Sequence, residues 1–199
     1  MAIKITGDNV YLRLMQESDV ATIATCLEDI TPKVPNDREQ KVFWWRVNNL
    51  NSEIFSGRSV QSSDRGTVTF TLCKKSDDSI LGWNQTTYNG GMFISFFSAL
   101  VAAHRGKGYY SEMSNLRHKF FFSDNWGGQT SRLKIATTGD TNPLRKTLDS
   151  LYTTTKETVN IAVYGQYRWS EVTKNEWTTW INHSDRSTLK NQSYTLEWT

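Results

Sequence analysis

Cysteine is scarce in this sequence of 199 residues, which contains only Cys26 and Cys73. Two cysteines so far apart form neither the framework of a small disulfide-bonded protein nor the closely spaced pairs of a structural zinc site. We therefore expect two free thiols in a reducing cytosol, and no bound metal ion.

Long apolar runs are missing as well. No segment approaches the length of about 20 residues that a membrane-spanning helix requires. The first residues, Met1-Ala-Ile-Lys-Ile-Thr6, lack the apolar core of a secretory signal peptide. We expect a cytoplasmic protein with no membrane partner.

The sequence also lacks a large excess of one charge, since 23 Lys and Arg stand against 20 Asp and Glu. The resulting net charge of +3 suits an anionic cofactor but falls well short of a nucleic-acid-binding domain, so we do not expect a nucleic-acid partner. The length fits one domain, residues 1–199, and the composition is ordinary for an α/β or α+β protein.

The segment from Phe93 to Met113 organises the chain. Residues 93–101 are apolar enough for a buried strand, and the sequence from Tyr109 onward predicts a helix. Between them lies Arg105-Gly-Lys-Gly108, whose two glycines allow a sharp turn with uncovered N–H groups. Because a helix start adds free N–H groups and a positive dipole end, the junction predicts a phosphate or diphosphate site.

A Gly-x-Gly pair alone is a weak signal, because many such pairs only make a turn, and that alternative stays open on the local pattern. Two other phosphate loops are excluded. No Gly-Lys-Ser/Thr follows at the spacing of a Walker loop, and Ser111 stands where the dinucleotide-binding pattern has its third glycine.

The segment Arg105-Gly-Lys-Gly-Tyr-Tyr-Ser-Glu112 resembles the acetyl-CoA pyrophosphate loop of the GNAT acetyltransferases. It is most similar to the Rim-type branch, the ribosomal-protein N-terminal acetyltransferases and their relatives, where Gly-Lys-Gly-Tyr-Ala-Thr-Glu is usual. Tyr110 departs from that pattern. The resemblance covers residues 10–181 and implies the α+β GNAT fold. This fold has a twisted, mixed but mostly antiparallel sheet of about seven strands flanked by helices.

The start of the chain supports this resemblance. Val10 to Met15 alternates as a half-buried strand, Ser18 is a natural N-cap, and an amphipathic helix then extends to Ile30. Rim-type enzymes begin with the same order, Leu-Arg followed by Ser-Asp.

A second helix is expected over residues 36–55. In the family this helical pair borders the cleft for the acceptor. Phe43, Trp44 and Trp45 would then line a pocket, and packing in the core or at its rim is the alternative.

The remaining elements follow in the order of the family. Strands are expected at residues 67–72 and 80–88 with a turn at 76–79, at 132–137, 159–164 and 166–172, and a second hairpin at 89–91. Thr173 and Glu176 predict a capped short helix, as in the Rim-type ending. Residues 189–198 exceed that ending and form either an extra edge strand or a homodimer contact.

Asn142, followed by Pro143, predicts another helix start. It resembles the second family motif, in which the asparagine hydrogen-bonds the pantetheine arm. Arg145 replaces the usual serine of that motif, and Tyr152-Thr153 replaces its Gly-Phe. Asn142 as a plain helix cap is the alternative, and both roles can hold at once.

The resemblance implies how acetyl-CoA is held as a co-substrate, with no metal. Strand-end backbone groups would pair with the pantetheine amides, loop N–H groups would bind the pyrophosphate, and an N–H near Val101 would polarise the thioester. The residues implied are Leu100, Val101, Ala102, Arg105, Gly106, Lys107, Gly108, Tyr109, Tyr110, Asn142 and Arg145. The amine would attack directly, without an acyl-enzyme.

The general base is not evident, because Ser95 stands where many relatives carry a glutamate. Candidates are Glu171, His104 beside the loop, and a water held by Ser95 or Ser98. Tyr152 is the candidate for the acid that protonates the leaving thiolate, and a core aromatic is the alternative.

The resulting prediction is an N-acetyltransferase that moves acetyl from acetyl-CoA to a primary amine, on a protein N-terminus or a small molecule. Trp44, Trp45 and Trp83 are assigned to the acceptor substrate. One alternative is a GNAT-fold binding protein without catalysis, which the missing carboxylate and tyrosine favour. Another is an acyltransferase acting on RNA or DNA bases, which the mild basicity permits.

Overall fold

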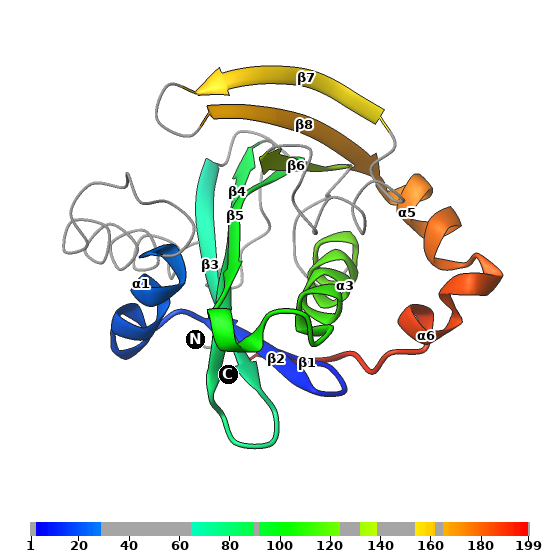
Figure 1. The fold of residues 1–199 in the computed structure, drawn as a ribbon. Coiled ribbons are helices and arrows are strands. Elements are labelled where there is room, and N and C mark those ends of the chain that lie inside the picture. The colour runs from blue at the N-terminus through cyan, green and yellow to red at the C-terminus, as the bar shows by residue number, and fades with distance from the viewer. Residues whose placement is uncertain are drawn as a thin grey trace.

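The structure is a computed structural model that describes residues 3–28, 65–89, 92–123, 132–138, 154–161 and 165–198. Nine strands of these residues form one sheet in the order β7-β8-β6-β5-β4-β3-β2-β1-β9. Only β5 and β6 run parallel, and every other neighbouring pair is antiparallel. Helices lie on both faces of the sheet (Figure 1). The α+β class and the mixed sheet are confirmed, while the expected count of about seven strands is too low.

The strands are β1 (Ile3–Thr6), β2 (Val10–Leu14), β3 (Arg65–Lys74), β4 (Ile80–Asn89), β5 (Met92–Leu100), β6 (Arg132–Thr138), β7 (Thr154–Ile161), β8 (Gly165–Thr173) and β9 (Thr195–Trp198). The helices are α1 (Val20–Glu28), α3 (Tyr109–Phe122), α5 (Lys174–Ile181) and α6 (Ser187–Lys190). Three 3₁₀ turns accompany them, η1 (Glu17–Asp19), η2 (Ala102–His104) and η3 (Ser184–Arg186).

The entry into α1 differs from the expectation. Ser18 is not the N-cap but lies inside the turn η1. Gln16 is the N-cap of this turn, and the Oδ2 of Asp19 accepts a hydrogen bond of 2.8 Å from its N–H. Two further groups, Arg13 and Thr71, also donate to the carboxylate of Asp19.

The two faces of the sheet carry separate apolar clusters. One lies under α3, where Met113, Leu116 and Phe120 pack on residues of β1 to β4. Phe70 of β3 meets Phe120 edge to face, with ring centroids 6.0 Å apart. The other cluster lies under α1 and contains Met15, Val20, Ile23, Cys26, Trp83 and Ala99. Because α1 and α3 cover opposite faces (Figure 1), the strand β5 between them is held from both sides.

Gly82 brings β4 and β5 unusually close together. A Cβ at this position would lie 2.2 Å from the carbonyl oxygen of Ala99 and 2.9 Å from Cα of Leu100. No side chain fits against that backbone, so only glycine permits this contact. The contact fixes the end of β5, from which the predicted loop departs.

The later elements confirm some boundaries and correct one. Thr173 and Glu176 form the expected capping box of α5. The strand β7 begins at Thr154, five residues before the predicted start at Val159. Its first half, Thr-Thr-Lys-Glu, has no apolar alternation, so the sequence did not mark it. Pairing with β8 extends the strand there, with a bulge between Thr155 and Glu157.

The side chain of α5 residue Trp177 packs on α3 through His118. Their rings lie nearly parallel, 13° apart, with centroids separated by 6.3 Å. Burial, assisted by the nearby Arg117 charge, lowers the pKa of His118 to about 3. The imidazole is therefore neutral at pH 7 and serves as a core aromatic between the two helices.

Residues 189–198 were predicted to form either an extra edge strand or a homodimer contact, and the structure shows an edge strand there. The strand β9 pairs antiparallel with β1, from Ile3 opposite Trp198 to Thr6 opposite Thr195. Cys26 and Cys73 are both buried, and neither forms a disulfide with a described residue.

Candidate functional site

The site begins where β5 and β6 part. Their parallel pairing extends only from Met92 opposite Arg132 to Ser95 opposite Ile135. Beyond Ser95, β5 continues with β4 to Leu100, after a register shift at Gln85, while β6 continues with β8. Among the described strands, the last part of β5 therefore has no partner on its β6 side. An extended ligand with amide groups can pair with such an edge.

The loop that follows β5 has the predicted form. Gly106 and Gly108 both have positive φ, of 75° and 82°. Gly108 is the N-cap of α3 and has a left-handed backbone, which glycine adopts without steric cost. A Cβ at either glycine would meet nothing within 4 Å, so the loop lies open to solvent.

The loop and the start of α3 present backbone N–H groups that have no described acceptor. In the described part of the chain, no hydrogen bond uses the N–H groups of residues 106–111, and the first bond of α3 runs from the N–H of Glu112 to the carbonyl of Gly108 at 3.3 Å. Six consecutive donors thus converge at the positive end of a helix of 14 residues. Such an arrangement binds phosphate or another anion.

The N–H groups of Val101 and Arg105 already donate to carbonyls of the protein. The N–H of Val101 donates to the carbonyl of Leu81 at 2.9 Å, because the ladder between β4 and β5 extends one residue past the strand end. The N–H of Arg105 donates to Ala102 within the turn η2, at 3.2 Å. The N–H of Val101 is therefore engaged within the sheet, and the donors without a described acceptor start at Gly106 rather than Arg105.

The loop side chains are exposed or partly so. The Nε of Arg105 donates to the carbonyl of Leu100 at 3.0 Å, which folds its guanidinium back over the end of β5. Lys107 is exposed. Tyr109 and Tyr110 are half-buried and pack against the cluster under α3, so Tyr110, the departure from the family pattern, contributes to the core.

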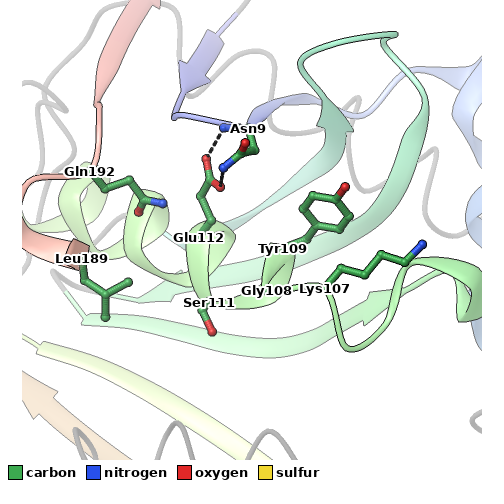
Figure 2. A pocket seen from close by; sticks show the side chains of 8 residues that line it. All are labelled: Asn9, Lys107, Gly108, Tyr109, Ser111, Glu112, Leu189 and Gln192. Carbon is green, nitrogen blue, oxygen red and sulfur yellow. Dashed lines mark hydrogen bonds between the residues drawn. The ribbon is translucent and has the colours of Figure 1, made fainter.

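A pocket of about 330 Å³ lies beside this helix start (Figure 2). Its walls come from the loop, the first turn of α3, the turn between β1 and β2, and α6 with the chain that follows it. The lining residues are Asn9, Lys107, Gly108, Tyr109, Ser111, Glu112, Leu189 and Gln192. Five of them, Asn9, Ser111, Glu112, Leu189 and Gln192, had no assigned role from the sequence.

Glu112 ties the start of α3 to the sheet. It is 6% exposed, and its carboxylate accepts hydrogen bonds from the N–H of Asn9 at 2.8 Å, the side-chain amide of Asn9 at 3.1 Å and the N–H of Val10 at 3.2 Å. Gly7 makes room for it, because a Cβ there would lie 2.5 Å from the Oε1 of Glu112. These hydrogen bonds fix the start of α3, which carries the free N–H groups, to the turn between β1 and β2.

We expect Glu112→Ala to lower the free energy of unfolding by about 2–4 kcal/mol, because it leaves buried N–H donors without an acceptor. Glu112→Gln should recover at least half of that loss, since its amide oxygen can accept from both backbone donors. Urea unfolding followed by circular dichroism measures both. Glu197→Ala, at an exposed glutamate of β9, is the control and should change stability by less than about 0.5 kcal/mol. A loss below 1 kcal/mol for Glu112→Ala contradicts the anchoring role.

The candidate bases occupy different rows of the sheet. Ser95 is the last residue of β5 that pairs with β6, in the row of Ile135 and Ser170. Glu171 pairs with Lys134 in the neighbouring row. Its next neighbour Val172 is buried under α3, and successive residues of a strand alternate in direction, so half-buried Glu171 faces the side of the sheet opposite α3.

The remaining predicted residues are placed as follows. The hydroxyl of Ser98 accepts a hydrogen bond of 2.6 Å from Asn84, and half-buried His104 lies edge to face against Tyr109. Trp83 is fully buried in the cluster under α1, so its side chain has no surface to offer an acceptor. The predictions for Trp44, Trp45, Asn142, Arg145 and Tyr152 concern residues that lie outside the described part of the chain.

Comparison with known proteins gives a result at the level of structure. No protein-family model and no curated protein matches the sequence. A GCN5-related N-acetyltransferase from Brucella melitensis matches with a TM-score of 0.65 at 12% identity, over 94% of this chain and 83% of the other. The nucleotide-linked sugar GNAT FdhC matches with 0.64 at 14% identity, over 92% and 97% of the two chains. The chain has the GNAT fold.

The sequence-based expectation of this GNAT fold is thereby confirmed. A ribosomal-protein-S5-alanine acetyltransferase from Vibrio fischeri is also among the similar structures, with a TM-score of 0.64 at 14% identity over 87% and 98% of the chains. The name of that Vibrio fischeri protein makes it a ribosomal-protein acetyltransferase, the kind of enzyme that the loop sequence resembles. In the described residues, no three or more His, Cys, Asp or Glu side chains form a metal-binding group, and no helix there has the length and apolarity to span a membrane.

Proposed function

We propose that this protein is an acetyl-CoA-dependent N-acetyltransferase of the cytoplasm. The observation that carries the proposal is the row of N–H groups of residues 106–111 at the start of α3. No described residue accepts a hydrogen bond from them. The diphosphate of coenzyme A supplies the anionic oxygens that such donors bind. The free edge of β5 beyond Ser95 suits the two amides of the pantetheine arm, which can add to it like a strand.

In this proposal the chain orients the thioester and moves two protons. The amine nitrogen attacks the acetyl carbon, a tetrahedral intermediate forms, and the sulfur leaves as a thiolate. Glu171 is the proposed base that takes a proton from the ammonium of the acceptor, directly or through a water held at Ser95, so that the neutral amine can attack. Tyr152 is the proposed acid for the thiolate. Arg105 and Lys107 add positive charge beside the diphosphate.

The proposed acceptor is a primary amine, on a protein N-terminus or a small molecule. Its site is proposed to include Trp44 and Trp45. The face of the sheet opposite α3 is the side to which Glu171 points, and an acceptor reaching that residue has to approach from there.

One observation favours a different function. The strand β5, Met92–Leu100, contains no Asp or Glu, although many relatives place their base on this strand. A GNAT-fold protein that binds acetyl-CoA without transferring the acetyl group would have such a strand. The two functions share the diphosphate site and differ only in turnover.

The test is release of free thiol from acetyl-CoA in the presence of a panel of amines, including N-terminal peptides and polyamines. We expect at least one amine to raise thiol release about tenfold above hydrolysis. Glu171→Gln should then lower kcat by about 10²-fold or more while the KM for acetyl-CoA stays within a factor of three.

Glu197→Gln, at an exposed glutamate of β9, is the matched control and should leave kcat unchanged. An unchanged kcat in Glu171→Gln removes that residue from the mechanism. Saturable binding of acetyl-CoA without turnover of any amine supports the non-catalytic alternative, and absence of binding contradicts both functions.

A further inference from the structure

The chain after α5, residues 182–198, docks against α3, and its last part, residues 189–198, exceeds the Rim-type ending. The side-chain amide of Asn115 donates to the carbonyl of Leu189 at 2.8 Å and to the Oε1 of Gln192 at 2.6 Å. The ammonium of Lys119 donates to the carbonyl of Gln192 at 2.7 Å. With β9 added to the sheet, these bonds fix the segment beside the start of α3.

This docking builds the pocket of Figure 2, because Leu189 and Gln192 form its wall opposite Lys107 and Tyr109. The pocket and the opening between β5 and β6 lie on opposite sides of the loop. In the sheet order, β6 is on one side of β5, whereas the turn between β1 and β2 that carries Asn9 is on the other side. A ligand held at its diphosphate by the loop can therefore extend in two directions.

We propose that the C-terminal segment is part of the cofactor site, and that the adenosine 3′-phosphate end of coenzyme A occupies this pocket. The inference rests on the proposed function, in which the pantetheine arm takes the side of β5 and β6. The nucleotide then takes the other side. The volume of about 330 Å³ lies in the range of small-ligand pockets.

The polar groups of the pocket match an adenine base. The Nδ2 of Asn9, a lining residue, donates to Glu112, so the Oδ1 of Asn9 is the side-chain atom that remains to accept a hydrogen bond from a ligand. Gln192 accepts from Asn115 through Oε1, which leaves its Nε2 as a donor. One acceptor and one donor suit the amino group and the adjacent ring nitrogen of adenine.

The rest of the lining suits the ribose phosphate and the base. Lys107 and the hydroxyl of Ser111 offer a charge and a hydrogen bond to the 3′-phosphate, while Leu189 offers an apolar surface to the base. Glu112 does not repel the phosphate strongly, because three N–H donors from Asn9 and Val10 already hold its carboxylate.

The first measurement uses the unaltered protein and calorimetric titration with acetyl-CoA and with S-acetyl-4′-phosphopantetheine, which lacks the nucleotide. We expect acetyl-CoA to bind at least tenfold more tightly. Equal affinities overturn the inference while leaving the proposed function intact. Binding of neither ligand overturns the proposed function, and the inference falls with it.

The second measurement fills the pocket by Leu189→Trp. We expect acetyl-CoA to bind at least tenfold more weakly than to the unaltered protein, while S-acetyl-4′-phosphopantetheine binds within a factor of three. Lys190→Trp, the neighbouring exposed position of α6 outside the pocket, is the matched control and should change neither affinity. Unchanged acetyl-CoA affinity in Leu189→Trp, or an equal loss for both ligands, contradicts the inference.

Discussion

Replacement of Gly108 by tryptophan should weaken acetyl-CoA binding by at least about 100-fold, which corresponds to about 2.7 kcal/mol. Gly108 is the N-cap of α3, and a side chain there projects into the open space in front of the N–H groups of residues 106–111. An indole in that space occupies the position of the diphosphate. Calorimetric titration with acetyl-CoA measures the loss directly.

The fold itself should survive this substitution. A Cβ at Gly108 meets no atom within 4 Å, so the cost is the positive φ alone, about 1–2 kcal/mol for a residue other than glycine. Gly108→Asn is the matched control, because asparagine tolerates this conformation and has a small side chain. It should keep acetyl-CoA affinity within about fivefold of the unaltered protein, on the estimate that little strain is added. If Gly108→Trp binds as the unaltered protein does, the diphosphate does not sit at this loop.

A large effect on stability is expected at Asp19. Its carboxylate is 2% exposed and accepts from both guanidinium nitrogens of Arg13 at 2.6 and 2.7 Å, from the hydroxyl of Thr71 at 2.7 Å and from the N–H of Gln16 at 2.8 Å. Asp19→Ala leaves a partly buried cation and two donors without an acceptor. The free energy of unfolding should fall by about 3–5 kcal/mol, as measured by urea unfolding at pH 7.

A second ion pair in the protein provides the control. Lys74 and Asp77 also lie 2.6 Å apart, but their side chains are 34% and 49% exposed. Water and salt screen such a pair, so Asp77→Ala should lower the free energy of unfolding far less than Asp19→Ala does. Similar losses in the two variants would mean that the burial of Asp19 adds nothing to its role.

The loss at Asp19 should also depend on pH. Burial alone raises the pKa of this carboxyl, but the hydrogen bonds from Arg13, Gln16 and Thr71 outweigh it and hold the pKa below its usual 3.8. The unfolded chain therefore binds the proton more readily than the folded one. The contribution of Asp19 is fully present above pH 3.8 and disappears as the pH falls through the lower native pKa. The difference between the unaltered protein and Asp19→Ala should be constant at neutral pH and narrow at acid pH.

The elements that the sequence predicted well are those with local signals. The strand β5, the glycine turn and α3 follow from an apolar run, two glycines and a helical spacing, all within residues 92–122. The free N–H groups at the helix start follow from the same local geometry. The hydrogen bond of the Val101 N–H could not be predicted, because its partner Leu81 lies on a neighbouring strand whose register no local pattern reveals.

The parts of the site that were missed depend on contacts between distant residues. Glu112 was visible in the loop motif, but its partner Asn9 lies 103 residues away. Asn115 meets Leu189 and Gln192 across separations of 74 and 77 residues. Polar side chains carry no signal of such partners, so the pocket wall built by the C-terminal segment could not be predicted.

The pairing of β9 with β1 affects the order in which this protein can fold. Ile3 can pair with Trp198 only after β9 has been synthesised, so the outer edge of β1 lacks this partner until then. Contacts of such long sequence separation form late, because closing a large loop costs entropy before any contact rewards it. Leu189 and Gln192 directly precede β9 in the chain and are synthesised just before it. The nascent chain therefore completes its sheet and the wall beside the glycine loop in the same late step.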